Sequence, residues 1–262
     1  MLVFRVAWKN LVSSLRGEYV DFIISRVAFT LLSVGTAAVL FGLNGGRTGA
    51  AFGLAPGRYL GWITVGAALY GTTRGILLNV SRTLMTERRE GTLEAVLIAP
   101  FPRWQYYGGN QLHQLMLTGM DIAIAAGLSL PLGIEYRFSL LPLIGGTILL
   151  FATLYGLALL TSLAMILLKD TFFIQNTLLP LLLILGGYLF PLNVLPPFLR
   201  LPGEWLPLQL GVELLRHGCL GAEAAVSAPL YALALLKSVA FLAAGFLLLP
   251  FVERRALEDY LS

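Results

Sequence analysis

The chain has 262 residues, of which 57% are hydrophobic and 12% are charged, and its mean hydropathy is +0.81. A soluble domain carries about 25% charged residues, so this composition excludes a disordered chain and disfavours a soluble globular enzyme. The net charge of +4 comes from basic residues that mostly flank apolar runs. There they indicate membrane topology and lipid headgroup contacts rather than nucleic acid.

Residues 1–20 predict an amphipathic helix. Apolar residues recur there at spacings of three and four, and basic residues lie beside them. A basic amphipathic helix with aromatic residues fits the membrane surface, and a short soluble cap helix is the alternative. The apolar stripe is Phe4, Trp8, Leu11, Val12, Leu15 and Tyr19, and the basic residues are Arg5, Lys9 and Arg16.

Six apolar stretches follow, each long enough to cross a bilayer core of about 30 Å as a helix. A further segment, 194–227, is too apolar for an ordinary loop and too rich in proline for a full span, which favours a re-entrant or interfacial helical hairpin. The predicted spans are 22–43, 59–80, 109–132, 139–168, 172–193 and 228–251.

The basic residues predict the orientation. Segments on the side of the N-terminus hold roughly twice as many Lys and Arg residues as segments on the other side. We therefore expect a multi-pass protein of the cytoplasmic (inner or plasma) membrane, with both termini in the cytoplasm and the hairpin outside.

The chain lacks the residues for ATP binding or metal catalysis by the common routes. A Walker A loop needs Gly-Lys followed by Ser or Thr, and Lys9, Lys169 and Lys237 all follow other residues. The predicted topology places His113 and His217 on opposite sides of the membrane. A Ser-His-Asp arrangement around either histidine stays open, although no nucleophile stands out.

The segment 81–104, called the elbow below, predicts a helical break on the cytoplasmic side. Charges of both signs precede Gly91, which should break the helix, and Thr92 is a plausible N-cap for a short second helix that Pro100 and Pro102 stop. An apolar patch framed by charges suits docking to another protein, and a solvated interfacial loop is the alternative.

The elbow resembles the cytoplasmic signature of type-2 ATP-binding-cassette (ABC) exporter permeases. The pattern Glu-Arg-x-x-Gly-Thr-Leu-Glu-x-x-Leu-x-x-Pro runs from Glu87 to Pro100. In that family the elbow is the coupling helix, which sits in a cleft of a separate ATPase subunit. The resemblance assigns ATPase coupling to Glu87, Arg88, Glu90, Gly91, Thr92, Leu93, Glu94, Leu97 and Pro100.

The segment from Leu201 to Arg216 resembles the re-entrant outer hairpin of the same family. It departs from the pattern at Leu208 and Gln209, where a proline would be expected. The resemblance covers essentially the whole chain. It implies an all-α integral membrane protein with one permease domain, 1–262, made of six transmembrane helices, the interfacial helix, the coupling helix and the hairpin.

The resemblance also implies the function and the partners. We expect the transmembrane subunit of an ATP-driven exporter, paired with a second permease copy in a homodimer or heterodimer and surrounded by membrane lipid. ATP and Mg would bind the partner ATPase, and this chain would hold no cofactor. An ion-gradient-driven transporter is the alternative, although Asp121 is the only acidic residue clearly within a span. A non-transporting anchor subunit is another.

Several residues in the predicted spans are candidates for a substrate path. A charge at Arg74 is costly in lipid, so we expect Arg74 to line the path, to pair with a carboxylate such as Asp121, or to pack in a polar helix contact. In the resembling family spans two and five line the path, which makes Tyr70, Asn176 and Tyr188 candidates, with ordinary packing as the alternative.

Two further patterns concern helix contacts. Ala67, Gly71 and Gly75 form a small-residue stripe that predicts a close helix neighbour, in this chain or in a second copy. Glu213 and Arg216 are three residues apart and could pair on one helix face. Together with Trp205 they are candidates for an outer gate.

Overall fold

The computed structural model describes residues 2–17, 56–91, 103–134, 136–168, 174–189, 191–221 and 228–261, with short pieces between 24 and 42. Most of the first predicted span, 22–43, and the elbow residues 92–102 lie outside the described residues. The described part is helical, with one isolated bridge between Arg137 and Leu220. This agrees with the predicted all-α class.

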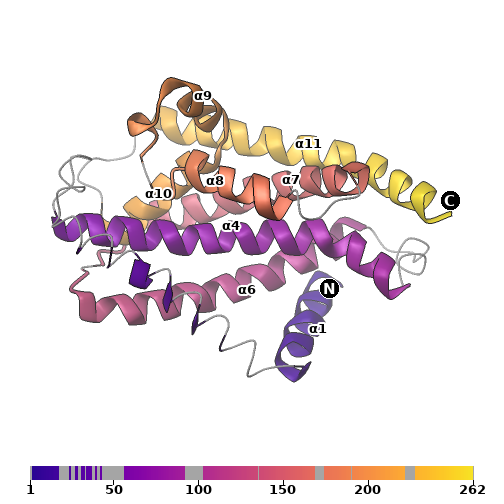
Figure 1. Ribbon diagram of the computed structural model, residues 1–262, viewed down its shortest axis with the longest axis horizontal. Helices are drawn as coiled ribbons and strands as arrows, with labels where there is room; N and C mark the ends of the chain where they lie inside the picture. Colours follow the sequence, from indigo (N-terminus) through magenta and orange to yellow (C-terminus); the bar gives the residue numbers. More distant parts are fainter. Residues whose placement is uncertain are drawn as a thin grey trace.

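Four long helices run side by side, and shorter helices pack against them (Figure 1). The α-helices are α1 (Leu2–Gly17), α4 (Pro56–Glu90), α6 (Arg103–Ser129), α7 (Leu140–Leu168), α8 (Leu179–Leu185), α9 (Pro197–Trp205), α10 (Leu208–Leu220) and α11 (Ala228–Leu261). Short turns of other helix types are η1 (Leu130–Leu132), η2 (Ile174–Leu178) and η3 (Leu192–Val194).

Three segments of the described helices are long and apolar enough to cross a membrane: Gly108–Leu132, Leu140–Ser162 and Ala228–Leu248. They fall on the third, fourth and sixth predicted spans. The second predicted span, 59–80, lies within α4, a continuous helix of 35 residues. The protein is therefore a helical membrane protein.

The fifth predicted span, 172–193, is not one regular helix. The π-turn η2 precedes α8, which has only 7 residues. Pro180 lies in the first turn of α8, where its ring would clash with the carbonyl of Asn176 in a regular helix. A wider π-turn relieves such a clash. After α8 the chain turns at Gly187, whose φ of 69° favours glycine.

α7 is the central helix of the bundle. In its most apolar window 56% of residues are buried, against 22% for α6 and 17% for α11, so the latter two are peripheral. α7 and α11 approach closely, since a Cβ atom added at Gly156 would lie 2.4 Å from the carbonyl oxygen of Phe241. The Thr153 hydroxyl donates to Ser238 Oγ over 2.8 Å at the same contact.

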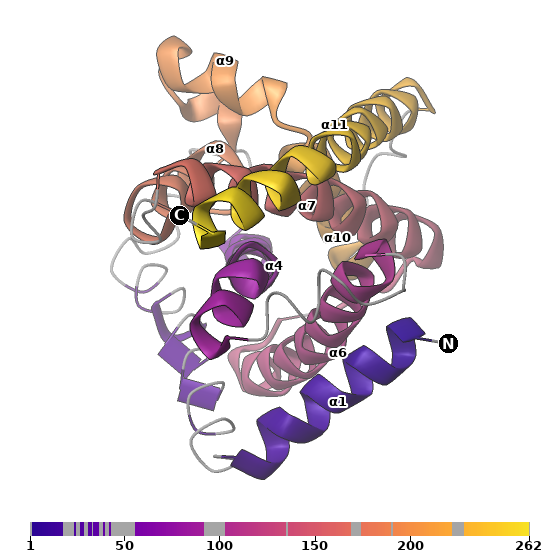
Figure 2. The ribbon, with the colours of Figure 1, turned by 90° about the vertical axis from the view of Figure 1, so that its right-hand side faces the viewer.

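Polar contacts join α1, α6 and α4 near one end of the bundle. α1 runs crosswise to the long helices (Figure 2) and packs on α6, where Asn10 donates a 2.6 Å hydrogen bond to Asn110. Asn79 of α4 donates to Gln114 of α6. A Cβ atom at Gly75 would lie 2.1 Å from Gln114 Nε2. At Gly75, the small-residue stripe predicted from the sequence therefore packs against α6 of the same chain.

The predicted hairpin, 194–227, contains two helices with different surroundings. α10 packs between α7 and α4, and a Cβ atom at Gly218 would lie 2.7 Å from the backbone nitrogen of Leu143. α9 projects from the bundle (Figure 2), and Gly203 is its buried residue. The hairpin therefore has one arm fixed in the bundle and one arm exposed.

The α7–α11 contact should depend on the missing side chain at Gly156. Gly156→Ala forces the helices apart, and we expect a loss of about 1–3 kcal/mol of stability, the usual cost of overpacking. Gly119→Ala is the matched control, because nothing lies within 4 Å of a Cβ atom there. It should be neutral or raise stability by up to about 1 kcal/mol. Thermal unfolding in one detergent compares the two, and equal midpoints would contradict this packing.

Candidate functional site

Arg216 of α10 lies at the centre of a contact between three parts of the chain. Its side chain is 5% exposed. Nε donates to the carbonyl oxygen of Trp62 over 3.2 Å, Nη1 to that of Gly187 over 2.8 Å, and Nη2 to that of Tyr188 over 2.5 Å. We call Arg216, Trp62, Gly66, Gly187 and Tyr188 the arginine junction. It joins α10 to α4 and to the turn after α8.

The ring of Trp62 adds a second kind of contact. The guanidinium carbon of Arg216 lies 3.5 Å from the ring centroid. A cation over an indole face is attracted by the ring quadrupole, by about 2 kcal/mol or more when the pair is desolvated. Trp62 therefore holds the same side chain by its backbone and by its ring.

Glycines make room for the junction. A Cβ atom at Gly66 would lie 1.9 Å from the carbonyl oxygen of Tyr188 and 2.2 Å from Arg216 Nη2. Gly187 has a left-handed backbone, which ends the helix and leaves carbonyl groups without helical partners. The guanidinium supplies the donors that these carbonyls need.

The predicted pair of Glu213 and Arg216 is not how the guanidinium is held. Its three hydrogen bonds go to backbone carbonyls, and the Glu213 carboxylate accepts a 2.9 Å hydrogen bond from Gln209 Nε2. The physical reason is burial. The Arg216 side chain is buried between the helices, where backbone carbonyl groups can accept its hydrogen bonds, whereas Glu213 is partly exposed.

Two of the predicted path residues lie in a packed layer next to the junction. Tyr188 has 0% exposure, and its hydroxyl lies 2.6 Å from that of Thr73. Tyr70 donates to the carbonyl oxygen of Leu179 over 3.2 Å, and the two tyrosine rings lie 5.7 Å apart. These tyrosines join α4 to α8. In this conformation Tyr188 is a core residue and does not line an open path.

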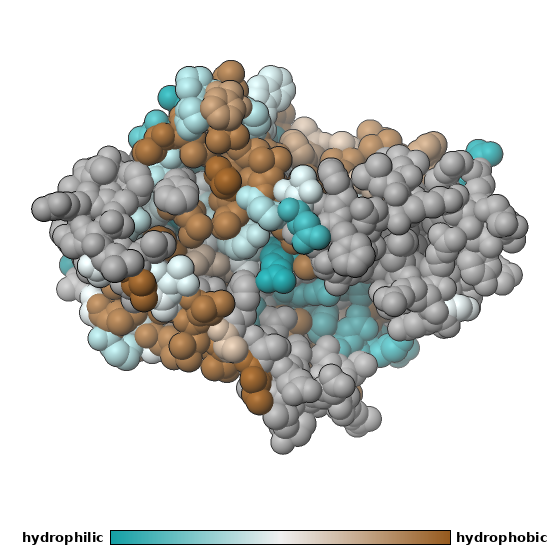
Figure 3. Space-filling model, in the orientation of Figure 1, coloured by the Kyte–Doolittle hydropathy of each residue, from teal (hydrophilic) through white to brown (hydrophobic). Residues whose placement is uncertain are grey.

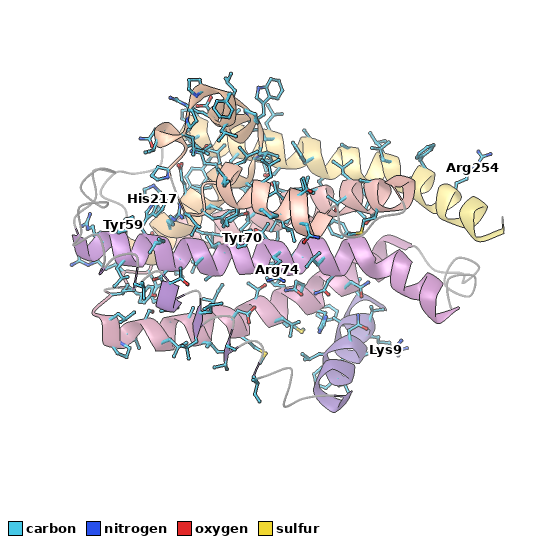
Figure 4. All side chains as sticks on the ribbon, in the orientation of Figure 1. Lys9, Tyr59, Tyr70, Arg74, His217 and Arg254 are labelled. Atoms are coloured by element: carbon cyan, nitrogen blue, oxygen red, sulfur yellow. The ribbon has the colours of Figure 1, made fainter. Side chains whose placement is uncertain are left out.

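The other two predicted path residues, Arg74 and Asn176, are exposed on the single chain. Arg74 lies at mid-length of α4, above α6 in Figure 4, and is one turn from Tyr70. In the same orientation, Figure 3 shows hydrophilic residues gathered in the middle of this face, with apolar surface beside them. These hydrophilic residues are called the polar patch below.

The hairpin residues differ in exposure. Trp205 at the end of α9 is 79% exposed. Lys237 of α11 donates to the carbonyl oxygen of Glu204, in the last turn of α9, where a cation is favourable. Arg200 and Glu204 form an exposed ion pair of 2.6 Å. Lys237 thus joins α11 to the C-terminal end of α9.

The elbow begins as predicted. α4 ends at Glu90, and Gly91 has a φ of 70°, which breaks the helix. α6 then begins at Arg103. The side chains of Glu87, Arg88 and Glu90, and all of Thr92, Leu93, Glu94, Leu97 and Pro100, lie outside the described residues. Their predicted role in coupling stays a prediction.

The described residues contain no group of three or more His, Cys, Asp or Glu side chains that could hold a metal ion. His217 lies in the last turn of α10, and in Figure 4 it is at the same end of the molecule as Tyr59. Trp62, Gly66 and Gly187 were not predicted as functional residues from the sequence. The Gly186-Gly187 pair was a visible signal, whereas Trp62 and Gly66 read as ordinary residues of an apolar helix.

These features define a helical membrane domain, with the start of the elbow at one end and the two helices of the hairpin at the other. The family model for ABC-2 type transporters matches residues 2–220. The chain therefore belongs to the ABC-2 type transporter family, and it is a transmembrane component rather than a catalytic domain. No curated protein matches the chain significantly.

Removing the guanidinium should destabilise the junction. Arg216→Ala leaves buried carbonyls without donors, each costing about 1–3 kcal/mol, so we expect a total loss of about 2–4 kcal/mol in unfolding free energy. Arg216→Lys should recover only part, because an ammonium group cannot reproduce the planar fork or the stacking on Trp62. Thermal and denaturant unfolding in detergent provide the measurement.

Arg200→Ala is the matched control for this prediction. Its ion pair is exposed, so the change should stay within about 0.5 kcal/mol. Gly66→Ala keeps Arg216 but adds a methyl group where the guanidinium lies. It should therefore lower stability as Arg216→Ala does. If Arg216→Ala and Arg200→Ala unfold alike, the junction contributes nothing to the fold.

Proposed function

We propose that this chain is the transmembrane subunit of an ATP-driven ABC exporter. Two permease chains, identical or paralogous, would assemble with two copies of a separate ATPase. ATP and Mg would bind the ATPase, and the permease would move a hydrophobic or amphipathic substrate outward across the inner membrane by alternating access. Family membership supports the class, since ABC-2 membrane proteins generally work with an ATPase subunit.

One structural observation carries the mechanism: α4 runs unbroken from the elbow to the arginine junction. Its 35 residues make it about 50 Å long at 1.5 Å per residue. Glu90 ends it at the elbow, and Trp62 and Gly66 lie near its other end. A continuous helix transmits displacement along its axis, so movement of the elbow by the ATPase reaches the contact with the hairpin.

The junction gives that movement a defined target. Arg216 is bonded both to α4 and to the turn after α8. A shift of α4 relative to α8 cannot keep all its hydrogen bonds, so the hairpin must follow or the junction must open. We infer that the described arrangement is the closed outer state, and that closure of the ATPases on ATP separates α4 from α8 at this end.

The polar patch at Arg74 supports a second permease copy. An arginine facing lipid at mid-span costs at least about 2.5–3.5 kcal/mol. Arg74 is exposed on the single chain, and a polar environment at this surface, such as the boundary between two permease copies, would lower that cost. Polar residues with apolar surface beside them also suit an amphipathic cargo (Figure 3).

The first test is co-purification. We expect a tagged chain, extracted from its native membrane in mild detergent, to bring down a soluble subunit with a Walker A motif in equal amount, identified by mass spectrometry. The number of permease species in the sample separates a homodimer from a heterodimer. A chain that purifies alone would contradict the proposal and would favour ion-driven transport, for which Asp121 in α6 is the residue to test.

Coupling should depend on Gly91. Because its φ is 70°, Gly91→Val strains the backbone by about 1–2 kcal/mol and should misplace the elbow. We expect the assembled complex to keep basal ATP hydrolysis while losing stimulation by substrate and most transport. Glu94→Ala should act in the same direction through the ATPase contact. Both rates are measured on the complex in liposomes.

The control for Gly91→Val is Gly133→Val, at a turn whose φ of 74° imposes the same strain far from the elbow in sequence. Gly133→Val should leave coupling intact in the fraction that folds. If Gly91→Val retains substrate-stimulated hydrolysis and transport, the assignment of the elbow is wrong.

A further inference from the structure

The helix α1 has three distinct faces. At 100° per residue, Val6 and Asn10 share one face with Val3 and Ala7 beside them. This face is buried or half-buried against α6. The remaining surface of the described part of α1 holds four exposed residues: Phe4, Arg5, Trp8 and Lys9.

The four exposed residues form an aromatic pair and a basic pair on adjoining faces of α1. Phe4 and Trp8 are one turn apart, and they are 67% and 64% exposed. Arg5 and Lys9 are also one turn apart, on the adjoining face. Two large exposed aromatic side chains beside two cations match a helix that lies at the boundary between water and lipid.

The contact with α6 sets the depth of α1 in the membrane. Val3 and Val6 lie against Gly108 and Gly109, and a Cβ atom at Gly109 would lie 2.6 Å from Val6 Cβ. Gly108 is where the apolar segment of α6 begins. α1 therefore crosses α6 where its apolar segment begins, which is the level at which we expect the hydrocarbon layer to start, and it runs crosswise to the long helices in Figures 1 and 2.

The orientation of α1 is fixed by protein contacts. The 2.6 Å hydrogen bond between Asn10 and Asn110 and the close approach at Gly109 prevent rotation of the helix. Its aromatic and basic faces are thus held toward the surroundings. The charges exclude the hydrocarbon interior as the only neighbour, and the aromatic pair disfavours bulk water.

We propose that Arg5 and Lys9, with Phe4 and Trp8, form a binding surface for the headgroups of anionic glycerophospholipids. The aromatic rings contact the upper acyl chains, and the two cations contact phosphate groups. Attraction to an anionic surface amounts to about fivefold in affinity per basic residue near it. Two such residues predict a preference of up to about 30-fold over a zwitterionic lipid, weaker at high salt.

This proposal does not rest on the proposed transport function. An acidic surface of a partner protein could also attract two cations, and the experiment below separates that case. The continuity of the surface with the start of the apolar part of α6 favours lipid.

The test uses the full chain in bilayer nanodiscs that contain phosphatidylglycerol and phosphatidylcholine at equal mole fractions. Bromine on the acyl chains of one lipid or the other quenches tryptophan fluorescence on contact. The signal of Trp8 is the difference between the wild type and Trp8→Phe. The ratio of quenching by the two brominated lipids gives the local enrichment of phosphatidylglycerol.

We expect clear enrichment around Trp8 in the wild type, at least severalfold, and a ratio near one in the double variant Arg5→Gln/Lys9→Gln. The charge-matched control is Arg58→Gln/Arg137→Gln, which changes exposed residues elsewhere. Arg58 adjoins Tyr59, which lies at the opposite end of the molecule from Lys9 (Figure 4). The control should keep the wild-type ratio.

Three results would overturn the proposal. Equal quenching by both lipids in the wild type would show no preference for the anionic headgroup. An unchanged ratio in Arg5→Gln/Lys9→Gln would remove the role of these cations. Absence of Trp8 quenching by either lipid would mean that protein covers this face.

Discussion

A buried guanidinium must have its N–H groups hydrogen-bonded, and this requirement organises one end of the molecule. Arg216 satisfies it with carbonyl groups from α4 and from the turn after α8. The carbonyls of Gly187 and Tyr188 lie beyond the end of α8, where the chain turns at Gly187, and Gly66 leaves space for them and for the guanidinium beside α4. The buried charge of Arg216, the turn at Gly187 and the absence of a side chain at Gly66 therefore depend on one another. Losing any one of them would leave buried polar groups unpaired or crowd the contact.

The remainder of the described fold connects this junction to the opposite end. α4 is one helix along the whole distance, and α7 supplies the buried surface against which α4, α10 and α11 pack. Near the elbow, side-chain amides join α1 to α6 and α6 to α4. In a membrane, where lipid is as apolar as the helices, such polar contacts and close glycine approaches contribute much of the association between helices. The long helices are thus held in register at both ends of the described bundle.

Local sequence patterns predicted much of the fold. Apolar length predicted α6, α7 and α11, periodicity predicted α1, and Gly91 marked the end of α4. The interruption of the fifth span was not predicted, although Pro180 and Gly187 were visible, because tertiary contacts decide whether such residues kink a helix or end it.

The candidate site was less predictable because its contacts are distant in sequence. The pairing of Arg216 with Glu213 was a local inference at a spacing of three, whereas Trp62 lies 154 positions away and Tyr188 lies 28 away. Nothing in periodicity or composition indicates which carbonyls a buried arginine will reach. Tyr188 was predicted as a candidate for the substrate path, and in this structure its hydroxyl lies 2.6 Å from that of Thr73 inside the core.

The central claim is that nucleotide-driven motion of the elbow reaches the hairpin through α4 and Arg216. This motion is measured with two spin labels, one at Phe198, which is 72% exposed on α9, and one at Arg58, which is exposed near the start of α4. Pulsed electron paramagnetic resonance gives the distance between the labels. In the assembled complex, trapping ADP with vanadate should shift the distance between the labels, and Arg216→Ala should abolish or scatter that shift. A distance that is the same with and without trapped nucleotide would contradict the account.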